Sequence, residues 1–229
     1  MSEFDTVHLD MLFKVLRHKK RKRAEDVLDI IGTGFFQTTK DLTECLGVVN
    51  NLRWYFEDDG VASESQRGIL YSEKVHFYVP GDGRDPQCGY MLAKKFPRST
   101  VWSIDPRLRD EYFSSSKRQK SIRTEDWERR STEWTQKILH NQHLVKDIVE
   151  NFAISSEYVE ISIIVCVHNH GPIQKLYEDL LKVSKRVVVI SLPCCTDDSN
   201  LNTTPVKEFD DFGILSPKRR IFIWDSSQI

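Results

Sequence analysis

The sequence predicts an α/β fold in which a mostly parallel sheet carries helices on both faces. Three observations predict it: apolar strands recur along the chain, amphipathic helical segments separate them, and a further apolar strand closes the sequence. Strands that are apolar throughout are buried on both faces, and the helices between them supply the covering layers. The length of 229 residues suits one large domain or two small ones.

The periodicity of the apolar residues places each element. Strands are expected at Val75–Val79, Thr100–Ile104, Tyr158–Val167, Arg186–Leu192, Val206–Phe209 and Arg220–Trp224, with a short one before Arg123. Helices are expected over 89–96, 134–152 and 173–184, and residues 114–120 are expected to form a loop. The strand at Arg220–Trp224 is expected to be an antiparallel edge strand. Residues 1–70, with a helix start at Thr39, are predicted to be a helical N-terminal extension packed on a core domain of residues 71–229.

One βαβ unit is marked between residues 75 and 105. A glycine-rich turn that contains Gly81, Asp82 and Gly83 follows its first strand, and Asp105 ends its second strand. Glycines let the backbone approach a ligand closely, and the helix after the turn begins with unpaired N–H groups. A carboxylate 22 positions after Gly83 matches the spacing of about 20 at which such units bind a ribose diol. The unit predicts a nucleoside-binding site; the alternative is a surface turn between two core strands.

The composition is that of a globular protein of the cell interior. Charged residues make up 29% of the chain, and the net charge of −1 excludes a globally basic nucleic-acid coat but not a local basic patch. No apolar run reaches the roughly 18 residues of a membrane span, and we expect neither a secretory signal nor a membrane partner. Five cysteines without framework spacing indicate a reducing compartment, so we expect an intracellular protein, cytoplasmic or nuclear.

The strongest charge run of the sequence lies near its N-terminus. Its members are Arg17, Lys19, Lys20, Arg21, Lys22 and Arg23, interrupted only by His18. Clustered cations of this kind neutralise phosphates or serve as a nuclear address. The run predicts a nucleic-acid contact, and the alternative is a solvated helix face.

The tripeptide His168-Asn169-His170 follows the most apolar strand of the chain. Alternation along a strand would put His168 and His170 on the same side of the sheet. A histidine that titrates near neutral pH can act as general base toward a hydroxyl or an amine, whereas the alternative is a pair of turn residues that bond the backbone. Cys194 and Cys195 end the next strand, but adjacent cysteines chelate one ion poorly, so we predict no metal site.

Together these parts resemble the class I S-adenosylmethionine-dependent methyltransferases, over about two-thirds of the chain, from Val75 to Trp224. The resemblance implies a Rossmann-like sheet in which the fourth strand lies beside the first, so that the loops after both strands meet at the switch point. It implies S-adenosylmethionine as the cofactor. The residues that it places around this cofactor are Gly81, Asp82 and Gly83 at the amino-acid part, Asp105 at the ribose and Asp126 at the adenine.

The resemblance also assigns the end of the fourth strand. It places His168, Asn169 and His170 between the cofactor methyl group and the substrate. Three features depart from the family pattern. Val79 stands where the family has an acid, and Asp85 stands at the third glycine position, with the loop running on to Gly89. His-Asn-His-Gly-Pro replaces the usual Asn/Asp-Pro-Pro-aromatic motif.

Two functions therefore remain open on the sequence. The first is methyl transfer from S-adenosylmethionine to a nucleic acid, with RNA favoured because of the basic run and because the Pro-Cys-Cys sequence after the fifth strand is similar to that of some RNA-directed family members. The second is a catalytically silent methyltransferase fold that acts as a binding or assembly subunit with a protein partner. A nucleotide-binding protein of another α/β class is disfavoured because the chain has no GxxxxGK[ST] loop.

Overall fold

The computed structural model describes residues 36–57, 68–105, 119–121, 159–169, 173–194 and 201–228. Its strands are β1 (Val75–Pro80), β2 (Thr100–Ile104), β3 (Gln119–Ser121), β4 (Val159–Val167), β5 (Ser184–Leu192), β6 (Lys207–Asp210) and β7 (Arg220–Asp225). Its helices are α3 (Thr39–Glu57), the 3₁₀ turn η2 (Ile69–Tyr71), α4 (Gln87–Lys95) and α7 (Gln174–Val183). The basic run at 17–23, the helix expected at 134–152, Asp126, His170 and Cys195 lie outside the described residues.

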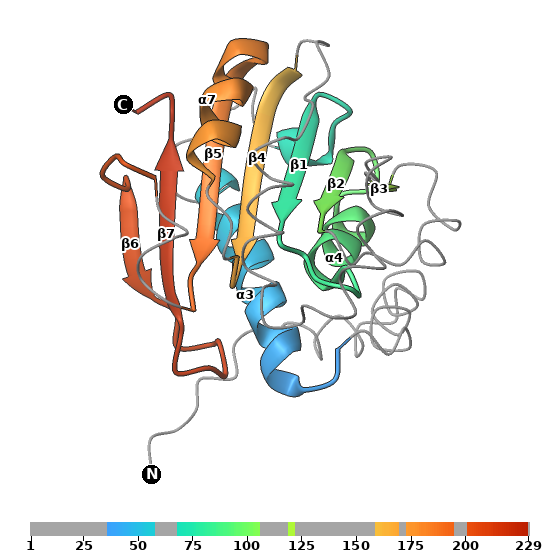
Figure 1. The fold of residues 1–229 in the computed structure, drawn as a ribbon, viewed down its shortest axis with the longest axis vertical. Coiled ribbons are helices and arrows are strands. Elements are labelled where there is room, and N and C mark those ends of the chain that lie inside the picture. The colour runs from blue at the N-terminus through green and yellow to red at the C-terminus, as the bar shows by residue number, and fades with distance from the viewer. Residues whose placement is uncertain are drawn as a thin grey trace, which may run out of the picture.

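The described strands form one sheet of order β3-β2-β1-β4-β5-β7-β6 (Figure 1). β1 pairs in parallel with β2 and with β4, and β5 continues the parallel set beside β4. β7 runs antiparallel to β5 and to β6. The chain is thus a Rossmann-like α/β fold with an antiparallel C-terminal edge, as predicted, and the strand order reverses between β1 and β4.

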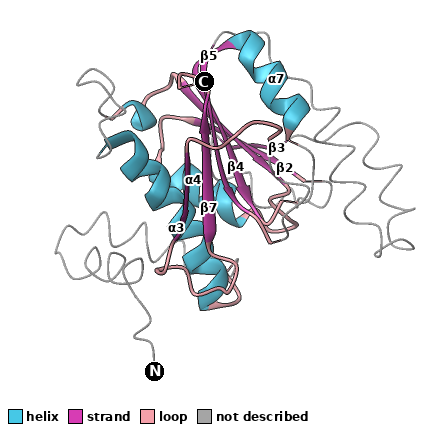
Figure 2. Cartoon of the chain, turned by 90° about the vertical axis from the view of Figure 1, so that its left-hand side faces the viewer, coloured by secondary structure: helices cyan, strands magenta, loops and turns pink. Residues whose placement is uncertain are grey.

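Helices cover both faces of this sheet, as Figure 2 shows: α3 and α4 lie on one side and α7 on the other. The side chains of β1 explain the arrangement, because they point alternately to the two faces. Phe77 and Val79 belong to the core beneath α3 and α4, whereas Tyr78 belongs to the core beneath α7. β4 and β5 alternate in the same way, so their apolar runs are buried throughout. A membrane-spanning helix is absent from the described residues.

The helix α3 begins at a capping box. The hydroxyl of Thr38 accepts the N–H of Asp41, and the carboxylate of Asp41 accepts the N–H of Thr38. The two bonds satisfy N–H groups that a helix start leaves without intrahelical partners. The predicted start at Thr39 is confirmed, and the helix runs through Gly47 to Glu57. Within the helix, the carbonyl of Gly47 accepts the side-chain amide of Asn51 at 2.9 Å.

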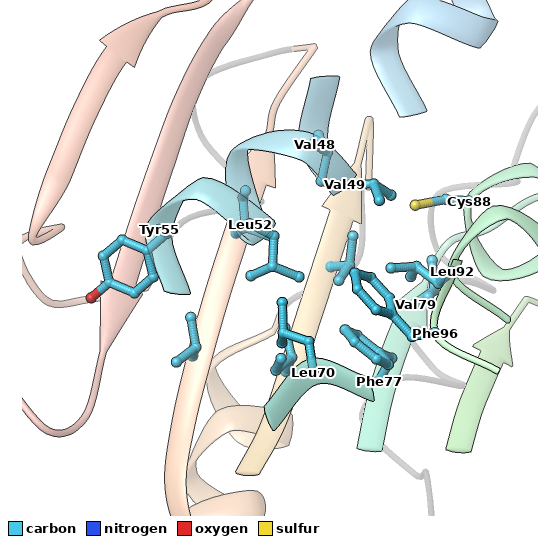
Figure 3. Packing of buried hydrophobic residues seen from close by; sticks show 14 of the residues in the cluster. Val48, Val49, Leu52, Tyr55, Leu70, Phe77, Val79, Cys88, Leu92 and Phe96 are labelled. Carbon is cyan, nitrogen blue, oxygen red and sulfur yellow. The ribbon is translucent and has the colours of Figure 1, made fainter. Parts of the chain in front are cut away.

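The apolar face of α3 packs on the centre of the sheet. Val48, Val49 and Leu52 point from the helix toward the sheet, where Phe77 and Val79 of β1 lie (Figure 3). All five side chains are at most 1% exposed. Burying a side chain of this size contributes about 1.5–3 kcal/mol, so this contact holds the helix to the sheet.

A buried ion pair joins β5 to β7 near the start of β5, at the end of the sheet opposite the glycine turn. Arg186 of β5 donates Nε–H to Asp225 of β7 at 3.0 Å, and its terminal nitrogen bonds the other carboxylate oxygen. The hydroxyl of Tyr55, near the end of α3, donates to Asp225 at 2.6 Å. Asp225 is fully buried and Arg186 is 6% exposed. Although burial raises the pKa of Asp225, the bonds from Arg186, Tyr55 and Ser227 hold it below 3.8.

Asp225→Asn is expected to destabilise the fold by about 3–5 kcal/mol, because it leaves the guanidinium of Arg186 buried beside a neutral group. The folded pKa of Asp225 is lowered, so its contribution is present above its ordinary value of 3.8 and is lost as the pH falls through the folded pKa. Urea unfolding of wild type and variant at about pH 7 and about pH 3 measures both effects.

The control is Asp210→Asn, which breaks a pair with Arg220 at the sheet edge. Both partners are exposed, so the loss should not exceed about 1 kcal/mol. Equal losses in the two variants would contradict a special role for the buried pair.

Candidate functional site

The turn after β1 has a backbone that favours glycine. Gly81 and Gly83 have φ values of 70° and 82°, in the left-handed region that side chains disfavour. The N–H of Gly81 donates to the carbonyl of Ile104 at 2.8 Å, which ties the turn to the end of β2. Both glycines therefore lie at the carboxyl edge of the sheet, where the sequence placed them.

Asp105 closes the same turn from the other side. Its carboxylate is 3% exposed and accepts the N–H of Gly83 at 2.9 Å. The two residues are 22 positions apart in the chain, so the spacing noted in the sequence corresponds to a direct contact. A Cβ added at Gly83 would meet only the carbonyl oxygen of Asp85, at 4.0 Å. The turn is thus open at Gly83, and a ligand can approach its backbone there.

The side chain of Asp82 points into the protein instead. Its carboxylate accepts the N–H groups of Cys88 and Gly89 at 3.0 and 2.9 Å and the hydroxyl of Ser103 at 2.7 Å. The first two bonds cap α4, which begins at Gln87, two residues before the expected start. Burial raises the pKa of Asp82 to about 7, even though these three donors favour the ionised form. Asp82 therefore supports the helix start, and only its backbone belongs to the open turn.

The end of β4 meets the glycine turn through Asn169. A Cβ added at Gly81 would lie 2.8 Å from Oδ1 of Asn169, so only glycine fits against this side chain. Asn169 is 2% exposed, and its amide lies 3.9 Å from Sγ of Cys166. The expected meeting of the loops after the first and fourth strands at the switch point is confirmed by this contact.

His168 turns away from the strand that precedes it. β4 ends at Val167, and His168 has a φ of 52°, so the strand alternation expected for the tripeptide does not continue through it. Its N–H donates to the carbonyl of Leu192 at 2.9 Å, which joins the ends of β4 and β5. Its Nε2 lies 2.8 Å from Oε1 of Glu44, at ion-pair distance though not in straight hydrogen-bond geometry. The imidazole is 25% exposed, whereas the carboxyl side chain of Glu44 is 3% exposed.

Glu44, the partner of His168, is a residue that the sequence analysis did not single out. It lies on α3, 124 positions before its partner, and adjoins the apolar residues that hold the helix to the sheet. The one local signal is an acid at an otherwise buried stretch of helix, because Thr43 and Cys45 on either side are also buried. Thr43 in turn accepts the N–H of Leu215 at 3.0 Å, so the segment between β6 and β7 lies beside this part of α3.

Three thiols are buried in the two cores: Cys45 of α3 and Cys88 of α4 in the core beneath those helices, and Cys166 of β4 in the core beneath α7. Burial raises the pKa of Cys166 to about 12, and contact with Cys45 together with burial raises that of Cys88. Thiols with raised pKa values are poor nucleophiles, so we assign Cys88 and Cys166 a packing role. Within the described ranges, no group of three His, Cys, Asp or Glu side chains is arranged to hold a metal ion.

No protein-family model matches the sequence, and no curated protein matches it. Among solved structures, a cyclopropane-fatty-acyl-phospholipid synthase-like protein from Lactobacillus casei ATCC 334 is similar, with 10% identity and a TM-score of 0.36. The match covers 81% of this chain and 57% of that one. The plantazolicin methyltransferase BpumL in complex with SAH is 12% identical, with a TM-score of 0.32 and coverage of 81% and 62%. This chain therefore spans less than two thirds of either protein. At these TM-scores the matches add no argument, and the fold assignment depends on the strand order observed in this chain.

Asp82→Asn is expected to flatten the pH dependence of stability between about pH 4 and pH 7. The folded pKa of Asp82 lies above its ordinary value of 3.8, so its contribution is full below that value and is lost as the pH rises toward 7. A difference of about three pKa units corresponds to roughly 4 kcal/mol. Chemical unfolding across this range measures the slope. A variant that loses as much stability as wild type over the range would show that Asp82 is ionised in the folded protein.

Proposed function

We propose that this chain is an S-adenosylmethionine-dependent methyltransferase. The observation that carries the proposal is the junction of three strand ends at the switch point, where Gly83 bonds Asp105 and Gly81 packs against Asn169. Open α/β sheets bind their ligands at this position. The resemblance read from the sequence adds the identity of the cofactor, because it concerns the same residues.

The residues at the junction fit a nucleoside cofactor. The backbone at Gly83 is open to close approach, and Asp105 stands at the tip of β2, where a carboxylate accepts bonds from a ribose diol. Gly81 and Gly83 would line the amino-acid part of the cofactor through their backbone. Asp126 remains the candidate for the adenine from the sequence alone.

S-adenosylmethionine supplies a methyl group on a sulfonium centre, which a nucleophile displaces in line. The protein contributes mainly by holding the reacting groups in this alignment, so no covalent intermediate with the chain is needed. His168, at the end of β4, is the base that takes the proton of a substrate hydroxyl or amine. The side chain of Asn169 packs against Gly81. His170 is the second histidine that the sequence assigns to this position.

The substrate class follows from the sequence. The basic run of Arg17, Lys19, Lys20, Arg21, Lys22 and Arg23 supports a nucleic-acid substrate, with RNA favoured, because such runs neutralise phosphates. The modest net charge of −1 means that this contact would be local rather than spread over the molecule.

A second candidate is a methyltransferase fold without catalysis, which binds a partner. Val79 stands where the family has an acid, and its side chain lies in the core beneath α3. The first N–H groups of α4 are occupied by Asp82, which leaves fewer backbone donors for the cofactor carboxylate. These two features favour weak or lost cofactor binding.

Calorimetry with S-adenosylmethionine and S-adenosylhomocysteine is the test of the cofactor site. Asp105→Asn keeps an oxygen for Gly83 N–H but removes the charge, and each lost hydrogen bond to a charged group is worth about 1.5–3 kcal/mol. We therefore expect affinity to fall at least tenfold in this variant. Asp210→Asn is the control, because Asp210 lies in β6 at the far edge of the sheet. If neither ligand binds wild-type protein, the cofactor proposal fails.

Methyl transfer from labelled cofactor into RNA, DNA and protein separates the two candidates. A positioned base contributes roughly 10²–10⁴-fold in rate, so His168→Ala and His170→Ala should reduce turnover by that order while cofactor affinity stays nearly unchanged. Label in RNA would support the substrate class. Cofactor binding without transfer into any of the three pools would favour the silent subunit.

A further inference from the structure

The carboxylate of Glu44 is buried, and burying a charged group costs free energy unless the group is paired. It is 2% exposed and lies on the helix that packs against the sheet. Its contacts are Nε2 of His168 at 2.8 Å, Nζ of Lys40 at 3.3 Å and the side chain of Ser216. Lys40 is 47% exposed at its side chain, so solvent screens that pair, and His168 is the closer partner.

The charge of Glu44 is retained in this setting. Burial raises the pKa of Glu44, but the contacts with His168, Ser216 and Lys40 outweigh burial and hold it below 4.5. A carboxylate that stays ionised accepts hydrogen bonds and cannot donate one. A ring nitrogen that bonds such a carboxylate must itself carry a proton.

The backbone of His168 aims the ring at this carboxylate. A φ of 52° is uncommon for a residue other than glycine, and such conformations cluster at functional sites. The bond from its N–H to Leu192 holds the conformation in place. Neither ring nitrogen is in hydrogen-bond geometry with a described residue, but Nε2 lies 2.8 Å from Oε1 of Glu44, and no such contact is found for the buried Nδ1 among the described residues. Most buried polar atoms in proteins have a hydrogen-bond partner, so Nδ1 is able to accept a bond from a ligand.

We propose that Glu44 is the positioning residue of His168: it holds the imidazole with the proton on Nε2 and so leaves Nδ1 as the proton acceptor of the site. The role of His168 as base rests on the proposed function, whereas the hold of Glu44 on its ring does not. A carboxylate that orients a histidine in one tautomer is a recurrent way to prepare a general base.

The proposed proton transfer takes place between the substrate and His168. The substrate's O–H or N–H bond breaks, its proton passes to the lone pair on Nδ1, and its electron pair stays on the heteroatom that takes the methyl group. The ring then carries a positive charge, which the ionised Glu44 stabilises at 2.8 Å. The proton leaves to water afterwards, which restores the neutral ring.

The ring nitrogens report on this arrangement without any assay of activity. In protein labelled with nitrogen-15 at histidine, and with His168 assigned from the His168→Gln variant, we expect a proton coupled to Nε2 that exchanges slowly with water. In Glu44→Gln this signal should move or vanish, because a neutral amide replaces the charged acceptor. Thr43→Val is the control, since it changes the neighbouring buried residue and its bond to Leu215 but leaves the pair intact.

The outcomes of this measurement decide the proposal. A slowly exchanging proton on Nε2 that depends on Glu44 and not on Thr43 supports it. A proton on Nδ1 in wild type, or a ring signal unchanged in Glu44→Gln, overturns it. Should Glu44→Gln fail to fold, the position of the proton in wild type is decisive by itself.

Kinetic measurements test the positioning role of Glu44 separately from the proposed methyltransferase activity. If wild type transfers methyl groups, Glu44→Gln should lower kcat by about 10- to 100-fold, the range found for partners that orient metal-binding histidines, with KM for the cofactor nearly unchanged. An unchanged kcat overturns the positioning role and leaves the methyltransferase. A wild type without transfer but with the expected ring signal overturns the proposed function and keeps the pair.

Discussion

The hydrogen bond from Gly83 N–H to Asp105 is the interaction on which the carboxyl edge of the sheet depends. It joins the turn after β1 to the tip of β2, and a second bond from Gly81 to Ile104 repeats the connection. Asp105 is almost fully buried, and a buried carboxylate is costly without such a partner. The two bonds tie the turn to β2, and its backbone at Gly83 has open space around it.

The two ends of the parallel strands carry different sets of contacts, and α3 reaches both. At the carboxyl edge lie the left-handed residues Gly81, Gly83 and His168, with the contact to Glu44. At the other edge Arg186, Asp225 and Tyr55 form a buried network with no unpaired charge among its members. Glu44 and Tyr55 are 11 residues apart on one helix, about 16 Å along its axis. The network at one end thus helps to hold the helix that carries Glu44 at the other.

The strands could be predicted from the sequence because they are buried on both faces and read as continuous apolar runs. β1, β4, β5 and β7 differ from their expected bounds by two residues or fewer. The short strand expected before Arg123 is confirmed as β3, but it begins at Gln119, inside the segment expected to be a loop, because its pairing with β2 is a tertiary contact that polar residues do not signal. The glycine turn and Asp105 could also be placed, since one local unit contains them.

The parts of the site that could not be predicted depend on contacts between distant segments. Asp82 looked like a ligand residue, yet it caps α4 through amides six and seven positions later, across the turn. The contact between Glu44 and His168 joins a helix to the end of β4, and neither residue has a local pattern that names the other. The left-handed φ of His168 likewise accompanies a bond to β5 that no local pattern predicts.

Titration of nitrogen-15-labelled wild-type protein with S-adenosylhomocysteine, followed through the backbone amide resonances, tests most directly whether the three strand ends form one ligand site. We expect the amides of Gly83, Asp105 and Asn169 to shift together with a single affinity, and those near Arg186 and Asp225 to stay unchanged. No shift at a saturating concentration of ligand, or shifts that leave the glycine turn untouched, would contradict this account.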